Sequence, residues 1–72
     1  MDRKQIFKER LVELRIEKGL TQRQLAKEIS IHHAVIGNWE TGKYSPSIDS
    51  LAIIANFFNV SADYLIGLKE DI

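Results

Sequence analysis

Cysteine is absent from this 72-residue sequence, which excludes a disulfide framework and a thiolate metal site. A charge excess is also missing, because ten basic and ten acidic residues give a formal net charge of zero. Nucleic-acid-binding domains usually carry a basic excess. No apolar run approaches the roughly 20 residues that span a bilayer, and the N-terminus lacks the apolar core of a signal peptide. These absences favour a soluble, cytoplasmic protein without a cofactor, a metal or a membrane partner.

The length allows one hydrophobic core. With 44% apolar residues, the chain can form a single compact domain, which we expect to span residues 1–72. Its folded part should cover about residues 5–67, and the tail at 68–72 has no evident reason to be ordered. A chain of this size buries only about 60% of its unfolded surface, so its stability should be modest.

The charges are unevenly distributed along the chain. Residues 1–18 carry six basic and four acidic groups, residues 19–47 carry three and two, and residues 48–72 carry one and four. The first two thirds therefore carry +3 and the last third −3. A basic excess this small predicts weak, strongly salt-dependent affinity for nucleic acid in general.

Residues 21–42 read as two short helices joined by a tight turn. Thr21 and Gln24 form a capping box, in which the hydroxyl and the amide each bond an unpaired backbone N–H. A helix therefore begins at about Gln22, and the turn falls at Ser30 and Ile31. The residues that this helix is expected to bury are Leu25, Ala26 and Ile29.

The second of these helices has two contrasting faces when its residues are placed about 100° apart. The large apolar face comprises Val35, Ile36 and Trp39. The opposite face comprises His33, Ala34, Gly37 and Asn38. An ordinary solvated face would carry Lys and Glu, whereas small hydrogen-bonding residues suit a helix that enters the major groove and touches base edges.

Three further helices complete an all-α chain. Residues 5–18 carry a buried stripe and end at Gly19, and a short helix follows Ser61 and closes at Gly67. Between them, Ser47 caps a helix over residues 48–58. The stripe of the first helix comprises Phe7, Leu11 and Leu14. The residues that the helix at 48–58 is expected to bury are Ile48, Leu51, Ile54, Ala55 and Phe58.

Several motifs resemble one known family. They are GLTQRQLAKEIS, the I-x-x-W-E-x-G-K run from Ile36, PSIDSL and NVSADYLIG. Together they are similar to the Cro and phage-repressor helix-turn-helix regulators of the xenobiotic-response-element type, over roughly residues 5–67. The resemblance implies a compact five-helix bundle of the lambda-repressor-like DNA-binding type, with the helix-turn-helix formed by its second and third helices.

The resemblance also implies a structural ion pair between Arg15 and Glu40, which would tie the first helix to the end of the third. The alternative is a solvated surface arginine, which contributes little. Two positions depart from the family pattern. Ser30 stands where the turn usually has glycine, and His32 replaces the usual Ser or Thr cap of the third helix.

The expected DNA contacts follow from the outward face of the third helix. His33 and Asn38 can hydrogen-bond base edges, Ala34 can touch a thymine methyl, and Gly37 lets the backbone approach closely. The residues expected to contact phosphates are Gln22, Arg23, His32, Thr41, Lys43 and Tyr44. For each polar side chain the alternative is plain solvation, and His32 could serve only as a cap.

The adjacent histidines do not suggest a metal site. Neighbouring residues on a helix point about 100° apart, and no third ligand is suitably spaced. A pH effect is the milder hypothesis: a protonated imidazole beside phosphate should raise DNA affinity as the pH falls through about 6.5.

Four apolar residues do not fit the predicted core: Val12, Ile16, Ile53 and Phe57. Scattered exposed apolar side chains are normal, but two such pairs suggest a contact surface. A symmetric homodimer on palindromic DNA is its natural use. The residues expected at this surface, from the last two helices and the tail, are Ile53, Phe57, Ile66 and Leu68.

The leading hypothesis is therefore a sequence-specific regulator of transcription, acting as a repressor and homodimer on double-stranded DNA in the nucleoid. The alternative is an antitoxin-like module of the same fold that binds a protein partner, with DNA autoregulation secondary. A scaffold role would leave the uncharged outward face unexplained. No nucleophile–base pair, phosphate loop or convergent carboxylates suggest an enzyme, and this domain offers no small-molecule site.

Overall fold

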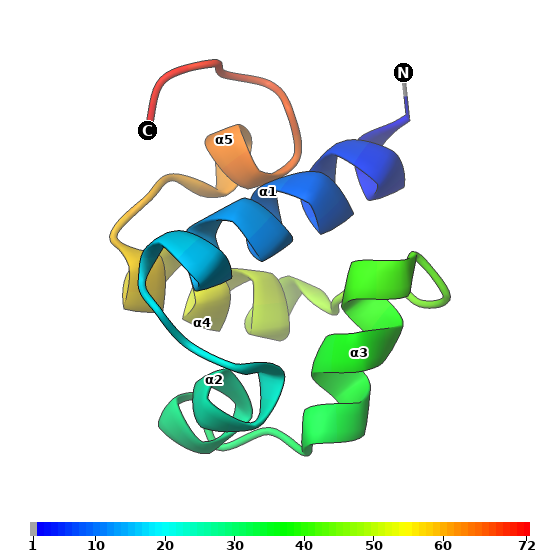
Figure 1. Ribbon diagram of the computed structural model, residues 1–72. Helices are drawn as coiled ribbons and strands as arrows, with labels where there is room; N and C mark the ends of the chain where they lie inside the picture. Colours follow the sequence, from blue (N-terminus) through cyan, green and yellow to red (C-terminus); the bar gives the residue numbers. More distant parts are fainter. Residues whose placement is uncertain (1) are drawn as a thin grey trace.

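The computed structural model describes residues 2–72, which form five helices and no strand. The helices are α1 (Arg3–Glu17), α2 (Gln22–Glu28), α3 (His33–Thr41), α4 (Ile48–Phe58) and α5 (Ala62–Leu65). Figure 1 shows α2 and α3 on one side of α1 and α5 on the other, with α4 behind α1. The predicted all-α, five-helix architecture is confirmed. Met1, which belongs to the predicted span 1–72, lies outside the described residues.

Side-chain caps define where the helices begin. The capping box of α2 is present, because the Gln24 backbone N donates to Thr21 Oγ1 at 3.1 Å and the Thr21 N donates to Gln24 Oε1 at 2.8 Å. The first helix starts two residues earlier than residue 5, because Asp2 Oδ1 accepts the backbone N–H of Gln5 at 2.7 Å. Ser47 and Ser61 cap α4 and α5 in the same way, as predicted.

All five helices contribute to one hydrophobic core. In that core the rings of Phe7 and Trp39 meet edge to face, with centroids 6.3 Å apart and planes at 78°. This contact fixes the inner face of α3 against α1, in the orientation that the apolar face predicts. The buried residues are Phe7, Leu11, Leu14, Leu25, Ala26, Ile29, Ile36, Trp39, Ile54, Ala55 and Leu65.

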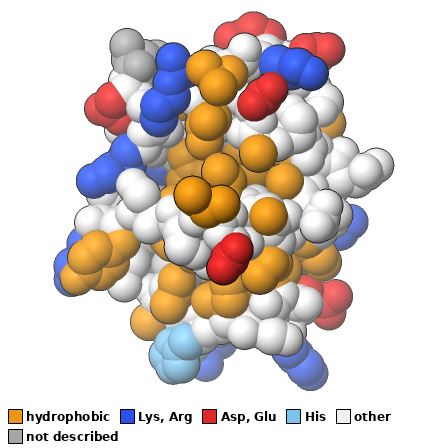
Figure 2. Space-filling model, turned by 180° about the vertical axis from the view of Figure 1, so that it is seen from behind, with side chains coloured by type: hydrophobic (Ala, Val, Ile, Leu, Met, Phe, Trp, Pro, Cys, Tyr) orange, Lys and Arg blue, Asp and Glu red, His pale blue; other side chains and the backbone are white. Residues whose placement is uncertain are grey.

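Two predictions for α4 are wrong. Ile48 is 87% exposed, because the inward stripe of α4 extends past the edge of the core at its first turn, where Leu51 is already only half-buried. Conversely, Phe57 is half-buried against the core rather than free at the surface. Its ring meets that of Phe58 edge to face, with centroids 5.0 Å apart. Seen from behind in Figure 2, apolar side chains form a broad patch on the face that carries α4.

The C-terminal tail makes contacts with α1 that the sequence did not predict. It curls back beside α5, as Figure 1 shows. Arg10 holds it by donating from Nη1 to the Lys69 carbonyl at 2.8 Å and from Nη2 to the Glu70 carboxylate at 3.2 Å. The same guanidinium lies 4.2 Å from the centroid of the Tyr64 ring. One α1 side chain therefore ties down both α5 and the tail.

The turn between α2 and α3 has a backbone feature that the sequence anticipated. Ser30 adopts φ +58°, in the left-handed region that favours glycine. Its backbone N–H donates to the Lys27 carbonyl at 3.3 Å, and the following Ile31 N–H donates to Ala26 at 2.9 Å. These bonds end α2 and turn the chain into α3. A serine in this conformation is strained relative to glycine.

Candidate DNA-binding site

The outward side of α3 presents the four residues predicted to contact bases. Ala34 is exposed, and His33, Gly37 and Asn38 are half-exposed. On the opposite side, Ile36 and Trp39 are buried at 0% and 3% exposure. The helix therefore has its large apolar side chains against the core and a shallow, small-residue surface towards solvent. Such a surface lets a helix lie close to base edges.

A network of charged hydrogen bonds fixes the C-terminal end of α3. Arg15 Nε donates to Glu40 Oε2 at 2.6 Å, and Arg15 Nη2 donates to Glu40 Oε1 at 2.9 Å. The two side chains are only 15% and 6% exposed. The hydrogen bond to Glu40 raises the pKa of Arg15 above its usual value and outweighs the effect of burial. This two-pronged geometry matches the guanidinium to the carboxylate and binds α1 to α3.

Gln22 is the third member of this network. Its Nε2 donates to Glu40 Oε1 at 3.0 Å, which joins the beginning of α2 to the end of α3. Its Oε1 lies 3.6 Å from where a Cβ on Gly37 would stand, so Gln22 also borders the outward face. An amide nitrogen carries two N–H groups, and one bond to Glu40 leaves the second for a phosphate. Sequence reasoning predicted the phosphate contact and missed the bond to Glu40.

The N-terminal end of α3 is held differently. His32 is its cap: His32 Nδ1 accepts the backbone N–H of Ala34 at 3.1 Å. The His32 and His33 rings stack, with centroids 4.5 Å apart and planes at 24°. The expectation that the two rings point about 100° apart is therefore wrong, because His32 precedes the helix and has an extended backbone with ψ 137°.

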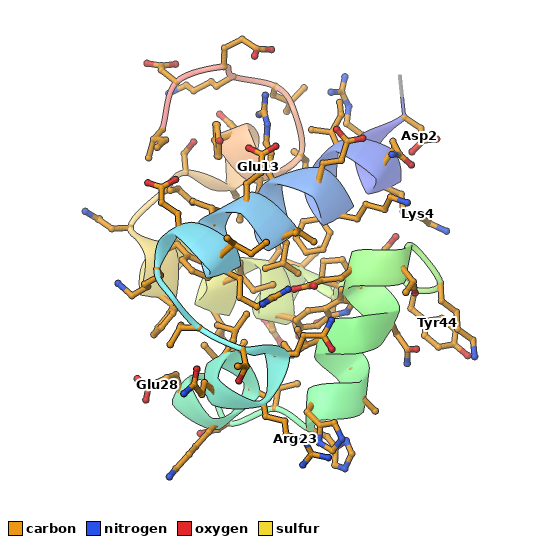
Figure 3. The ribbon with its side chains drawn as sticks, in the orientation of Figure 1. Asp2, Lys4, Glu13, Arg23, Glu28 and Tyr44 are labelled. Atoms are coloured by element: carbon orange, nitrogen blue, oxygen red, sulfur yellow. The ribbon has the colours of Figure 1, made fainter. Side chains whose placement is uncertain are left out.

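Arg23 of α2 faces this pair of histidines. Figure 3 shows Arg23 at the end of α3 where that helix begins. The pKa of His33 lies below its usual value, chiefly through partial desolvation and further through the positive charge of Arg23 and through His32. A neutral His33 ring offers one donor and one acceptor. The predicted contacts Arg23, His32 and His33 thus form one cluster.

The remaining predicted phosphate contacts gather at the other end of α3. Figure 3 shows Tyr44 projecting from the loop after α3, and this side chain is 57% exposed. Lys43 Nζ lies 5.6 Å from the centroid of the Tyr44 ring. The Thr41 hydroxyl donates to the Asn38 carbonyl at 3.3 Å, so it is partly occupied within the helix.

Two lysines of α1 belong to this end of the site and were missed by sequence reasoning. A Cβ at Gly42, which ends α3 with φ +80°, would lie 3.4 Å from Lys8 Cδ and 4.0 Å from Lys4 Cδ. Figure 3 shows Lys4 reaching out above the loop that carries Tyr44. The basic excess of the N-terminal third was the only signal for them, because the sequence does not show which α1 residues meet the loop after α3.

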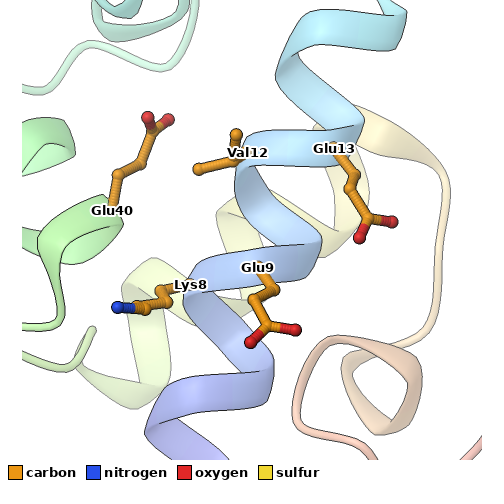
Figure 4. A pocket seen from close by; sticks show the side chains of 5 residues that line it. All are labelled: Lys8, Glu9, Val12, Glu13 and Glu40. Atoms are coloured by element: carbon orange, nitrogen blue, oxygen red, sulfur yellow. The ribbon is translucent and has the colours of Figure 1, made fainter.

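The surface of residues 2–72 has several hollows. Figure 4 shows one between α1 and α3, where Lys8 and Val12 point towards α3 while the Glu9 and Glu13 carboxylates point away from Glu40. Within residues 2–72, no group of three His, Cys, Asp or Glu side chains could hold a metal ion. Nor does that part of the chain contain a helix long and apolar enough to cross a membrane.

Comparison with known proteins identifies the class. The family model described as "Helix-turn-helix" matches residues 11–65, so the chain belongs to the helix-turn-helix transcriptional regulators. These are non-enzymatic proteins that bind double-stranded DNA. The resemblance to the Cro and xenobiotic-response-element type is confirmed.

Individual relatives include both characterised and uncharacterised regulators. The chain is 42% identical over 64 residues to the HTH-type transcriptional activator BcrR of Enterococcus faecalis, covering 89% of this chain and 31% of that protein. It is 38% identical over 61 residues to the HTH-type transcriptional regulator ImmR of Bacillus subtilis, covering 85% and 48%. A shorter uncharacterised HTH-type regulator of Archaeoglobus fulgidus is 36% identical over 62 residues, covering 86% and 89%. The chain thus spans less than half the length of BcrR and of ImmR.

Solved structures share the fold. The SOS-response transcriptional repressor LexA from Eubacterium rectale superposes with a TM-score of 0.84 at 28% identity, covering 89% of this chain and 68% of that one. A transcriptional regulator from Listeria innocua gives 0.80 at 29% identity, covering 92% and 62%. Helices α2 and α3 are therefore the helix-turn-helix of this chain.

Proposed function

We propose that the chain is a sequence-specific repressor that inserts α3 into the major groove of double-stranded DNA as a homodimer on a palindromic operator. The supporting observation is the contrast between the two faces of α3. Its outward face carries small, uncharged residues, and its opposite face is buried in the core and fixed by the hydrogen bonds to Glu40. A cytoplasmic, nucleoid-associated location follows from this role.

Base reading is assigned to the outward face. His33 can donate to guanine N7 or O6, and Asn38 can bond adenine N6 and N7 together. Ala34 contacts a thymine methyl, and Gly37 lets the backbone approach a strand. Each good base contact contributes about 1–3 kcal/mol of discrimination against the wrong base.

Phosphate contacts flank the reading face at both ends. The predicted residues are Gln22, Arg23, Thr41, Lys43 and Tyr44, with His32 either a phosphate contact or only a cap. Two lysines of α1 that lie near the end of α3, Lys4 and Lys8, extend this set. Contacts of this kind fix the register of the helix on the duplex but carry no sequence information. Because the chain has no net charge, these local groups supply the attraction, and affinity should fall steeply with salt.

The homodimer contact is assigned to the apolar patch of Figure 2, around α4 and the residues after α5. Ile53 and Leu68 are 42% and 58% exposed, while Phe57 and Ile66 are half-buried and can contribute only their outer edges. Ile48, which is 87% exposed, joins the proposed surface. A two-fold axis there would place two copies of α3 in successive major grooves, about 34 Å apart.

Selection from a random duplex library tests this function. The wild-type protein should enrich a palindrome whose half-sites lie about one helical turn apart. The His33→Ala and Asn38→Ala variants should each change the preference at particular base pairs. Weak binding that disappears with salt and is the same for all three proteins would contradict sequence reading.

Exposed apolar side chains also support a second candidate, an antitoxin-like module that binds a protein partner. Ile16 on α1 is 62% exposed and is not among the residues assigned to the homodimer contact. Sedimentation at micromolar concentration separates the candidates, since the repressor should be a homodimer and the module a stable monomer. Substituting Ile16 by Lys should leave the dimer of the repressor intact.

A further inference from the structure

We propose that His32 is a positioning residue for base reading, which holds the His33 ring in place through a cap and a ring stack. This inference rests on the proposed function, in which His33 reads a base. It replaces the expected phosphate contact of His32 with a role exerted through its neighbour. The supporting geometry is the hydrogen bond from Ala34 N to His32 Nδ1 and the parallel approach of the two rings.

The cap fixes the backbone beneath His33. The Ala34 N–H belongs to the first turn of α3, so no carbonyl within the helix can accept it. The His32 side chain accepts it instead. Ser, Thr, Asp and Asn usually supply this oxygen acceptor, and here a ring nitrogen supplies it. As an acceptor, Nδ1 carries no proton, so the capping His32 is the neutral ring with its hydrogen on Nε2. The cap thereby fixes the orientation of the His32 ring as well.

The stack then fixes the His33 side chain. A centroid distance of 4.5 Å and an interplanar angle of 24° are typical of offset-stacked rings. Among residues 2–72, no hydrogen bond engages the His33 ring, so stacking is the specific contact that restricts its rotation. Both of its nitrogens remain free for a base edge. The ring therefore meets the groove in a preset orientation without using its hydrogen-bonding atoms.

The charges around the pair support this arrangement at neutral pH. Arg23, from α2, is the charged group that lowers the pKa of His33, in addition to the effect of desolvation, and the neighbouring His32 acts in the same direction. A lowered pKa favours the neutral His33 ring, which offers one donor and one acceptor to a base edge.

Two substitutions separate the cap from the stack. His32→Asn retains a good cap and removes the stack, whereas His32→Phe retains a ring for stacking and removes the cap. Each variant is compared with wild type on the selected duplex and on duplexes changed at the base pair that His33 reads. We expect His32→Asn to reduce discrimination at that base pair by roughly threefold to tenfold, which is part of the discrimination that one complete base contact provides. Discrimination at the base pair read by Asn38 should stay unchanged.

A second readout uses the free protein. The ring-proton NMR signals of His33 should shift in His32→Asn, because the neighbouring ring current disappears, and should shift less in His32→Phe. Unchanged His33 signals in both variants would overturn the positioning role.

The controls distinguish this inference from the proposed function. His33→Ala must change the base preference, and if it does not, the reading role of His33 fails first. If His33→Ala does change it while His32→Asn and His32→Phe both retain wild-type discrimination, the positioning role is wrong. An equal loss of affinity on every duplex in the His32 variants would instead make His32 a phosphate contact and would equally overturn the inference.

Discussion

The two ends of α3 are held by different means. At its C-terminal end, Trp39 is buried in the core, and the Glu40 carboxylate accepts hydrogen bonds from Arg15 and Gln22. At its N-terminal end, the beginning of the helix depends on a single histidine cap and a stacked ring at the surface. One end is tied to α1 and α2 through buried charged groups, and the other faces solvent.

This difference suggests a division of roles along one helix. The C-terminal end fixes the orientation of α3 relative to α1 and α2, because side chains from all three helices meet at Glu40. The N-terminal end carries His33 and Ala34, which face solvent. Their side chains can therefore adjust to a base edge. Rigidity in the support and hydrogen-bonding capacity at the tip are both needed for a helix that reads sequence.

The largest effect is expected from the supporting end. Glu40→Gln leaves the Arg15 guanidinium largely buried without its carboxylate, and we expect a loss of about 3–5 kcal/mol in the free energy of unfolding. Urea denaturation measures it. Glu70→Gln is the matched control, because the Glu70 side chain is 92% exposed and its pair with Arg10 should contribute no more than about 1 kcal/mol. Equal losses in the two variants would contradict a special role for the buried pair.

A smaller effect is expected at the reading end. His32→Ala removes the cap of α3 and should cost about 0.5–2 kcal/mol of stability. His32→Ser should recover most of that loss, since serine is a good cap in the same extended conformation. Thermal unfolding of the two variants beside wild type measures the difference. If the Ala and Ser variants are equally stable, the hydrogen bond to Ala34 does not stabilise the helix.

The turn that joins the two helices should respond in the opposite direction. Ser30→Gly relieves a left-handed backbone, and after the entropic cost of glycine we expect a gain of about 0.5–1 kcal/mol in stability. Asn59→Gly is the control, because Asn59 has a similar φ of +55° but asparagine tolerates this region better than serine. Its gain should be smaller. A loss of stability in Ser30→Gly would show that the serine is not strained.

The smallest effect is that of pH on the reading end. The folded protein lowers the pKa of His33, so the unfolded chain takes up a proton more readily. Stability should therefore decline slightly as the pH falls through the unfolded value of about 6.5. DNA phosphates favour the imidazolium, so affinity should rise in the same direction, with most of the rise below about pH 6.5. Melting temperatures and binding titrations between about pH 5.5 and 7.5 measure both trends, and His33→Ala should reduce both.

Much of the fold could be predicted from local sequence signals. Helical period and caps located every helix, and the expected Arg15–Glu40 pair is present in the structure at 2.6 Å. Helical period gives the direction of a side chain but not where the core ends, so it could not show that Ile48 is exposed. The position of the tail depends in part on a hydrogen bond from Arg10 to the Lys69 backbone carbonyl. Every residue has such a carbonyl, so this contact leaves no signal in the sequence.

For the candidate site, the sequence predicted which side of α3 faces outward but not the contacts between the residues around it. The outward face of α3 follows from spacing alone. The bond between Gln22 and Glu40 joins residues 18 apart, and a glutamine at a helix start is equally suited to a phosphate. The histidine stack depends on His32 lying just outside the helix. The helical period does not locate the first residue of a helix to within one position.

The most direct test compares two variants on the same set of duplexes. One changes Gln22 of α2, which contacts the C-terminal end of α3 through Glu40, and the other changes His33 at the N-terminal end of α3. Binding of Gln22→Ala and His33→Ala would be titrated against the selected operator and against every single-base-pair change in one half-site. We predict that Gln22→Ala lowers affinity for all duplexes by a common factor. His33→Ala should lower affinity only for duplexes that keep the base pair that His33 reads, so discrimination at that base pair disappears. A common factor for His33→Ala, or a changed base preference for Gln22→Ala, would contradict the division between a supporting end and a reading end.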